Sequence, residues 1–217
     1  MWKNAEEFLL KDEYIGPLVL KYGSCSIKPR GKEYYFEDLL DSIVQQQLSM
    51  RAAAKIFERI KEKIYDKVGF KKTKKHKWRE AKTLNVKITP EKILSLPDKE
   101  LRSCGLSKAK IYYIKCLSEM VLSNKLEIRK LDRLSDEEVM QELLKIKGIG
   151  IWTSKMFLMF TLARPDIFPI EDLGLRNAFK KIIGKDLNRS EMEIFSLRWK
   201  PYRTIASWYL WRSLEST

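Results

Sequence analysis

Apolar side chains recur along much of this chain at the spacing of one face of an α-helix. In the segment 36–46 they fall at Phe36, Leu39, Leu40 and Ile43, which is the i, i+3, i+4, i+7 pattern of a helix with one buried face. The other segments with a helical pattern are 49–65, 106–121 and 201–214. No segment shows the alternation of a convincing strand, and only 18–27 is ambiguous. The sequence therefore predicts an all-α protein.

Signals for helix starts support this prediction. Thr89 followed by Pro90 matches an N-cap residue with proline at the first helical position. A capping box joins an N-cap Ser to a Glu three residues later, so that each satisfies a backbone N–H of the other. The predicted capping boxes are Ser135 with Glu138 and Ser190 with Glu193.

Two helical patterns meet at Gly148-Ile149-Gly150. This connection is too short for anything but a tight hairpin. Glycine in such a turn permits a positive φ and keeps side chains out of the turn. The second helix opens with backbone N–H groups that lack a partner inside the helix, so a phosphate can bind there. A purely structural αα-hairpin is the alternative. After a loop, Asp172 heads a further helical segment.

The charge of the chain indicates the kind of partner. Its 217 residues carry 43 Lys and Arg against 29 Asp and Glu, a net charge of +14. An excess of this size attracts a polyanion, which favours nucleic acid over the alternative of a merely soluble lysine-rich protein. No run approaches the length of a membrane span and the N-terminus does not resemble a secretory signal, so we expect no membrane partner.

A basic segment, residues 67–87, interrupts the helical pattern. It contains Lys71, Lys72, Lys74, Lys75 and Lys77 among few apolar residues. We predict an exposed loop between helices. A functional loop would be an arm that contacts the DNA backbone or, in a nucleated cell, a localisation signal. The alternative is a flexible solvated insert.

Cysteine and histidine are too sparse for a metal site or for histidine catalysis. Cys25, Cys104 and Cys116 are far apart and odd in number, which matches neither a disulfide framework nor a zinc spacing. The single histidine, His76, lies in the basic segment, where we expect a solvated surface role. These observations argue against His-based acid–base chemistry and favour a reducing compartment.

Five stretches of the chain together resemble the helix-hairpin-helix DNA glycosylases. They are the glutamine-containing stretch 40–54, the Gly-Leu-Ser stretch 101–110, the hairpin 144–153, the turn 168–176 with Asp172, and the Trp-Lys-Pro-Tyr-Arg stretch 199–206. The resemblance is to the alkylation-repair branch, the 3-methyladenine DNA glycosylase II family. It implies two helical lobes with a central cleft. One lobe is 36–165, with the hairpin helices 143–160, and the other is 1–35 with 166–217.

The resemblance implies that Asp172 is the catalytic residue. Departure of a base builds positive charge on the sugar, and a nearby carboxylate stabilises that state and orients the attacking water. One alternative is that Asp172 only caps the helix beginning at Leu173, a role that is compatible with catalysis. The neighbouring Glu171, which we expect to be exposed, is the other alternative for the chemistry.

The resemblance also assigns backbone groups of the hairpin to DNA. The N–H groups that would hold one phosphate lie near Gly148, Gly150, Trp152 and Thr153. The main-chain carbonyls at positions where the family binds a monovalent cation, Na⁺ or K⁺, are those of Leu144, Ile146 and Ile149. Such an ion would bridge hairpin and phosphate without taking part in the chemistry.

Base recognition is assigned to side chains in the same way. Trp152, Trp211 and Met156 match positions that line the family's base pocket, although the family often has tyrosine where Met156 stands. The alternative for the tryptophans is ordinary core packing. Gln47, or its neighbour Gln46, matches the wedge that fills the gap left by a flipped nucleotide. The alternative for these glutamines is a polar helix end.

Trp152 also bears on the reaction type. In bifunctional members of the superfamily a lysine at this position forms a Schiff base with the sugar, which tryptophan cannot do. Lys155, about one helical turn away, is a poor substitute. The resemblance therefore implies a monofunctional enzyme that uses water and leaves an abasic site in an uncut strand.

These inferences combine into one functional hypothesis with two rivals. We expect a monomeric glycosylase that excises alkylated bases, chiefly 3-methyladenine and 7-methylguanine, from double-stranded DNA. Its expected location is the cytoplasm, associated with the nucleoid, in a prokaryote and the nucleus in a eukaryote. The rivals are a glycosylase for oxidised or deaminated bases and a nonenzymatic protein that binds damaged DNA. No cofactor is expected for catalysis, and an iron–sulfur cluster is disfavoured because no cysteine follows Cys116.

Overall fold

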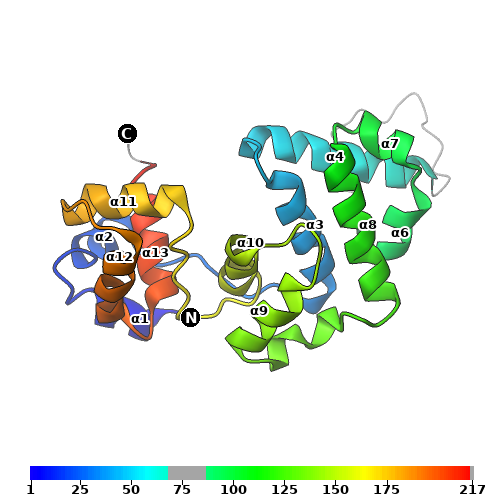
Figure 1. The fold of residues 1–217 in the computed structure, drawn as a ribbon. Coiled ribbons are helices and arrows are strands. Elements are labelled where there is room, and N and C mark those ends of the chain that lie inside the picture. The colour runs from blue at the N-terminus through cyan, green and yellow to red at the C-terminus, as the bar shows by residue number, and fades with distance from the viewer. Residues whose placement is uncertain (68–86, 216–217) are drawn as a thin grey trace. The chain divides into compact units, whose positions relative to one another are not determined.

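The computed structural model of the protein describes residues 1–67 and 87–215, apart from the side chain of Met50. Within these ranges every regular element is a helix and no strand occurs, which confirms the predicted all-α class (Figure 1). The lysines at 71, 72, 74, 75 and 77 and His76 lie outside the described residues. Among the helices of the described ranges, none combines the length and apolar character needed to cross a bilayer.

The chain divides into two compact units. The first comprises Met1–Arg30 and Ile151–Thr217, and the second is Gly31–Gly150. The boundaries of the units therefore differ from those of the predicted lobes, 36–165 and 1–35 with 166–217. The division after Gly150 falls inside the predicted hairpin, so its second helix begins the C-terminal part of the first unit.

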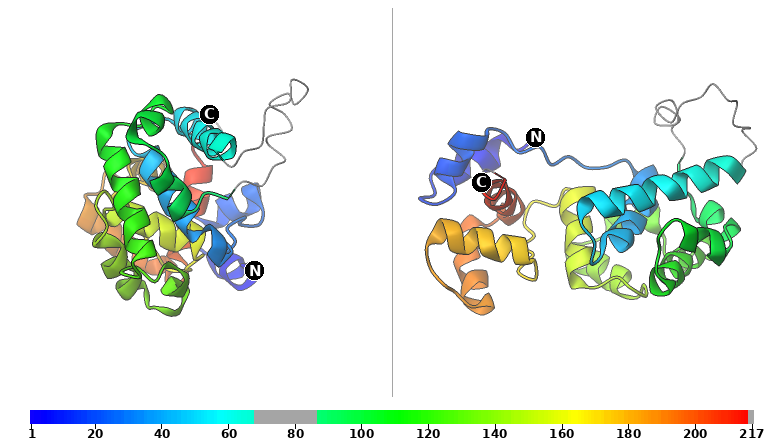
Figure 2. Two further views of the ribbon diagram at one scale, coloured as in Figure 1. Left: turned by 90° about the vertical axis from the view of Figure 1, so that its right-hand side faces the viewer. Right: turned by 90° about the horizontal axis from the view of Figure 1, so that it is seen from above.

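The second unit is built from helices whose apolar faces meet. Its elements are η1 (Lys32–Tyr34), α3 (Tyr35–Gln45), α4 (Met50–Lys67), α6 (Pro90–Ser95), α7 (Asp98–Ser103), α8 (Lys108–Leu122), η2 (Ile128–Arg133) and α9 (Asp136–Leu144). Helix α3 packs against α4 and α8, and α6 packs along α8 (Figures 1 and 2). Leu39, Leu40 and Ile43 are fully buried on α3, as the apolar spacing predicts.

The first unit is centred on the C-terminal helix. Its elements are α1 (Lys3–Leu9), α2 (Gly16–Tyr22), α10 (Ile151–Met156), the π-helical turn η3 (Phe157–Thr161), α11 (Leu173–Ile183), α12 (Arg189–Ser196), η4 (Leu197–Trp199) and α13 (Arg203–Arg212). Helix α13 contacts α1, α2 and α11 (Figure 1). Phe168, Phe179 and Trp199 form a buried aromatic cluster with ring centroids 5.8 to 6.4 Å apart. This cluster anchors the loop that leads to α11.

The helix starts agree with the predictions at two of three places. The Thr89 side chain accepts a hydrogen bond from the Lys92 N–H at the start of α6, and Ser135 forms the expected capping box with Glu138. The third prediction is wrong, because α12 begins two residues earlier, with Asn188 as N-cap. The ambiguous segment 18–27 continues as the end of α2 followed by irregular chain.

Candidate active site

Asp172 is the N-cap of α11. Its Oδ1 accepts a hydrogen bond of 2.6 Å from the backbone N–H of Leu175. This confirms the capping role, which was predicted as compatible with catalysis. The cap fixes one oxygen of the carboxylate relative to the helix and leaves the other oxygen to different partners.

Two indole N–H groups complete the surroundings of this carboxylate. Trp152 on α10 donates from Nε1 to Oδ2 of Asp172 at 2.9 Å, and Trp211 on α13 donates from Nε1 to Oδ1 at 2.9 Å. Both oxygens are thus engaged, and the plane of the carboxylate is fixed by three donors from three helices. The structure therefore brings Asp172, Trp152 and Trp211 together, although they are far apart in sequence.

Gly174 makes room for this arrangement. A Cβ at position 174 would lie 3.1 Å from Oδ1 of Asp172 and 3.6 Å from Nε1 of Trp211. The first distance is closer than a comfortable contact, so any larger residue pushes against the hydrogen bond between the two side chains. Sequence reasoning missed this glycine, because its neighbours in space come from remote positions.

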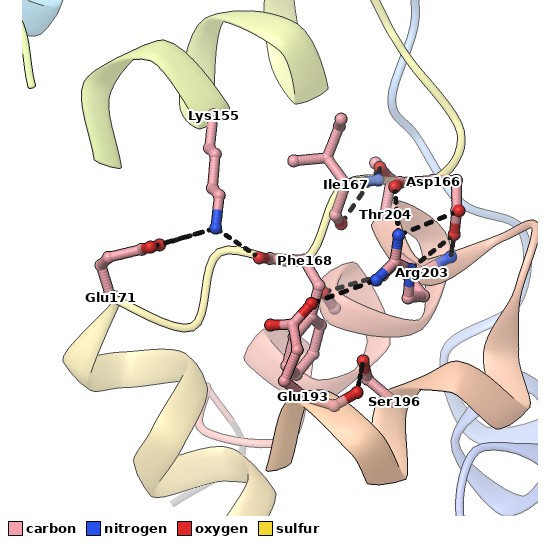
Figure 3. Close-up of polar contacts among 10 residues, drawn as sticks. Lys155, Asp166, Ile167, Phe168, Glu171, Glu193, Ser196, Arg203 and Thr204 are labelled. Atoms are coloured by element: carbon pink, nitrogen blue, oxygen red, sulfur yellow. Dashed lines mark hydrogen bonds and ion pairs between the residues drawn. The ribbon is translucent and has the colours of Figure 1, made fainter. Parts of the chain in front are cut away.

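Lys155 fixes the end of the loop before Asp172. Its Nζ donates to both oxygens of Glu171, at 3.1 and 3.0 Å, and to the carbonyl of Phe168 at 3.0 Å (Figure 3). The expectation that Glu171 is exposed is wrong, since its side chain keeps 28% of its accessible surface. The ammonium group predicted as a poor substitute nucleophile is held by three oxygens.

The start of the same loop is held by α13. The Arg203 guanidinium binds both carboxylate oxygens of Asp166, at 2.8 and 3.0 Å, and also Glu193 at 3.2 Å (Figure 3). The Thr204 hydroxyl accepts from the N–H of Ile167 at 2.9 Å. With Lys155 at its other end, the loop from 164 to 172 is clamped on both sides, and Asp172 is carried by a rigid segment. The sequence pointed to the stretch 199–206 but not to these partners.

Aromatic surface lies beside Trp211. The Phe160 ring is tilted by 36° against the Trp211 ring at a centroid distance of 5.8 Å, and Phe160 is 40% exposed. Phe160 belongs to the π-helical turn, a feature that is frequent at functional sites. Met156, at the end of α10, is half-buried, and its pocket role stays a prediction. Phe160 was missed because a helical apolar run indicates core packing by default.

The hairpin turn is shaped by one glycine rather than two. Gly148 has φ of 86°, as expected for a glycine turn. A Cβ there would meet the Tyr113 ring at 2.3 Å. At Gly150 the φ lies outside the positive region and an added Cβ meets nothing within 4 Å, so the positive φ that glycine permits in this turn is found at Gly148 and not at Gly150.

The backbone groups around this turn have the following positions. The N–H of Ile149 donates to the carbonyl of Ile146 at 3.1 Å and is used inside the turn. Trp152 and Thr153 lie in the first turn of α10, where N–H groups have no helical partner. Leu144, whose carbonyl is one of the predicted cation ligands, is the last residue of α9. The assignment of these groups to a phosphate and a cation stays a prediction.

The two candidate wedge residues differ in their surroundings. The Gln46 side chain donates from Nε2 to the carbonyl of Gly148 at 2.7 Å. Gln47 is exposed and has φ of 58°, in the left-handed region that a residue with a side chain rarely adopts. The Gln46 amide is thus occupied by a backbone carbonyl, and the wedge role of either glutamine stays a prediction.

We predict opposite behaviour for alanine at the two glycines of the hairpin. Gly148→Ala should lower the free energy of unfolding by about 1–3 kcal/mol, because a Cβ strains the backbone and collides with Tyr113. Gly150→Ala should leave stability nearly unchanged, and it should still weaken DNA binding if a phosphate approaches the backbone there. Thermal unfolding and binding to duplex DNA measure the two effects. A stable Gly148→Ala protein would contradict the account of the turn.

Comparison with known proteins identifies the family. Residues 40–204 match the model of the HhH-GPD superfamily of base excision DNA repair proteins. The chain is 32% identical over 215 residues to the alkylbase DNA glycosidase-like protein mag2 of Schizosaccharomyces pombe, covering 97% of this chain and 93% of that protein. It is 34% identical over 189 residues to DNA-3-methyladenine glycosylase 1 of the same yeast, covering 84% and 73%.

A solved structure agrees with these relatives. The 3-methyladenine DNA glycosylase Mag1 of the same yeast, in complex with abasic DNA, has a TM-score of 0.79 and 31% identity, covering 98% of this chain and 97% of that one. The family predicted from the motifs is thereby confirmed. This chain belongs to the HhH-GPD superfamily of base excision DNA repair proteins, in the family of the 3-methyladenine DNA glycosylases.

Proposed function

We propose that this protein hydrolyses the N-glycosidic bond of alkylated bases in double-stranded DNA, with Asp172 as the catalytic carboxylate. The single observation that carries the assignment to Asp172 is its carboxylate, held by the indole N–H groups of Trp152 and Trp211 and by the cap of α11. A carboxylate engaged in this way does not reorganise when positive charge appears nearby. Preorganised groups of this kind stabilise a charged transition state most effectively.

The chemistry assigned to Asp172 follows from the charge of the transition state. As the base departs with the electrons of the glycosidic bond, the sugar becomes oxocarbenium-like, and the carboxylate stabilises it. A water molecule then adds to the anomeric carbon and loses a proton, leaving an abasic sugar. A cationic alkylated base leaves without a general acid, which fits a described site that contains no histidine.

The tryptophans offer a reason for selecting alkylated bases. An indole N–H lies in the plane of its ring, so donation to Asp172 leaves the π faces of Trp152 and Trp211 uncommitted by that bond. A cationic purine stacks favourably on an electron-rich indole face, by roughly 0.5–2 kcal/mol per contact. The proposed substrates are therefore 3-methyladenine and 7-methylguanine ahead of neutral lesions.

Two substitutions of Trp211 should separate these contributions. Trp211→Phe keeps an aromatic face and removes the N–H, so excision of charged and neutral bases should fall alike, by about tenfold or more. Trp211→Ala removes the face as well, so excision of 7-methylguanine should fall further than excision of neutral hypoxanthine. Single-turnover rates on the two lesion duplexes measure the ratio. An unchanged ratio in Trp211→Ala would assign only shape or packing to this side chain.

We propose further that the enzyme lacks lyase activity. Trp152 cannot form a Schiff base, and Lys155 is bound to Glu171 and to the Phe168 carbonyl. Borohydride should therefore trap no covalent adduct between the protein and DNA that contains an abasic site, and the product strand should stay intact until treated with alkali. An adduct that disappears in Lys155→Met would show that this amine reaches the sugar after all.

The remaining DNA contacts are part of the same proposal. The first-turn N–H groups of α10 would hold a phosphate, and Gln47 would fill the space of the flipped nucleotide. A monovalent cation can be bound by neutral oxygens, which is the kind of ligand that the carbonyls of Leu144, Ile146 and Ile149 offer. The Ile146 carbonyl accepts from the N–H of Ile149 and keeps a second lone pair for such an ion. We propose a monomer that is cytoplasmic and associated with the nucleoid in a prokaryote, or nuclear in a eukaryote.

A further inference from the structure

The turn between α3 and α4 holds a side chain in a position that normally requires glycine. Gln46 has φ of −49° and ψ of 129°, Gln47 has φ of 58°, and the N–H of Leu48 donates to the carbonyl of Gln45 at 3.0 Å. These values match a type II turn with Gln47 at its third residue, where Gly or Asn is preferred. A glutamine there is strained, and such strain persists only where neighbouring groups hold it.

Lys110 on α8 supplies that restraint. Its Nζ donates to the carbonyl of Val44 at 2.7 Å and to the carbonyl of Gln46 at 2.6 Å. These are oxygens at the end of α3 that have lost their helical partners. Burial lowers the pKa of Lys110 from its ordinary value, which is consistent with an ammonium group that faces backbone oxygens instead of water.

Gln46 ties the same turn to the hairpin. Its Nε2 donates to the carbonyl of Gly148, and the N–H of the same peptide group, that of Ile149, donates to Ile146. The peptide after Gly148 is therefore fixed on both sides. Because Gly148 has no Cβ, the Tyr113 ring packs directly against the backbone of this turn.

From these contacts we infer that Lys110 and Gln46 are positioning residues that hold Gln47 in its strained conformation and couple it to the hairpin. The inference rests on the proposed function, in which Gln47 is the wedge and the hairpin holds a phosphate. The turn that carries the wedge and the hairpin turn at Gly148, both in the second unit, are then tied to each other. Loss of the hydrogen bonds of Lys110 or of Gln46 allows the turn to relax. Gln47 is then no longer held in the conformation in which it would enter the duplex.

The test uses duplex DNA with a tetrahydrofuran abasic analogue and 2-aminopurine opposite to it. Lys110→Met and Gln46→Met should each weaken binding to this duplex by about tenfold, the effect of losing one strong hydrogen bond, and lower the change in 2-aminopurine fluorescence. The matched control is Lys108→Met, which removes an exposed lysine near the start of the same helix. Lys108→Met should weaken binding to the abasic duplex only as much as the loss of one positive charge requires. On undamaged duplex, Lys110→Met should show the same small effect.

Two further variants keep the inference testable. Lys110→Arg should restore part of the affinity, because it can still donate to both carbonyls. Gln47→Gly should raise the melting temperature, since glycine suits the turn, while it lowers the fluorescence change. If Lys110→Met does not fold, Gln46→Met decides, because the hydrogen bond of this half-buried side chain within the described residues is the one to Gly148.

Equal effects of Lys110→Met and Lys108→Met on the abasic duplex, or unchanged binding by Gln46→Met, would overturn the inference. Binding to an abasic analogue needs no base release. Failure here is therefore distinct from failure of the proposed function, which would appear as no base release by the unaltered protein.

Discussion

Replacing Asp172 with asparagine is expected to lower the rate of base release by about 10³-fold or more, while binding to abasic DNA is largely kept. The substitution preserves size and the ability to cap α11, and it removes the negative charge that stabilises the sugar cation. The loss should therefore appear in the rate of the chemical step. Single-turnover excision of 7-methylguanine and affinity for an abasic duplex measure the two quantities.

The structure predicts a second effect of Asp172→Asn. Both carboxylate oxygens accept indole N–H groups, and the amide nitrogen of asparagine must face one of these donors. Stability should fall by about 1–3 kcal/mol. The matched control is Glu171→Gln, the adjacent carboxylate held by Lys155, which should keep most of the activity. An equal loss in both variants would move the catalytic role away from Asp172, and full turnover by Asp172→Asn would end the assignment.

The second large effect is expected at Arg203. Arg203→Met removes a guanidinium that is only 13% exposed and leaves the carboxylates of Asp166 and Glu193 without it. Removing one side of a fully buried ion pair costs about 3–5 kcal/mol, and the loss here should lie toward the lower end because Asp166 and Glu193 keep 24% and 45% of their side-chain surface. The loop that carries Asp172 should loosen as well, so kcat should fall in the protein that remains folded, with little change in KM.

Arg198→Met is the matched control for this prediction. Arg198 also contacts two carboxylates of the same unit, those of Asp12 and Glu13. Arg198 is 37% exposed, and the Asp12 carboxylate, although only 9% exposed, keeps the backbone N–H groups of Tyr14 and Ile15 as donors. Loss of Arg198 should therefore cost less than loss of Arg203, about 1 kcal/mol. Arg203→Lys should restore part of the stability but not the paired contact with Asp166. Denaturant unfolding measures the free energy of unfolding of these variants, and rates at saturating substrate measure their kcat. Similar losses in Arg203→Met and Arg198→Met would refute the clamp.

The helices and the cap at Asp172 are predictable because they depend on local spacing. Buried residues on α3 recur at helical intervals, and an acidic residue before an apolar helix is a good N-cap. The limit of local reasoning shows at α12. Asn188 with Glu191 and Ser190 with Glu193 both have the spacing of a capping box, and the structure uses the first. When α12 begins after Asn188, Met192 is buried in the core of the unit. The local sequence pattern does not show which of the two capping boxes buries this side chain.

The contacts that make Asp172 a site are not local. Trp152 and Trp211 reach it from 20 and 39 residues away, and Arg203 reaches Asp166 from 37 residues away. Motif resemblance pointed to the tryptophans as pocket residues but not to their hydrogen bonds. Gly174 and Phe160 carry no sequence signal of their own, since their roles arise only from the packing around Trp211.

The most direct test of the central claim is release of free bases from methylated duplex DNA, identified by chromatography. The account predicts that the unaltered protein releases 3-methyladenine and 7-methylguanine, that Asp172→Asn releases neither at a comparable rate, and that 8-oxoguanine is released poorly. Efficient release of 8-oxoguanine with no release of methylated purines would contradict it, as would the absence of any released base.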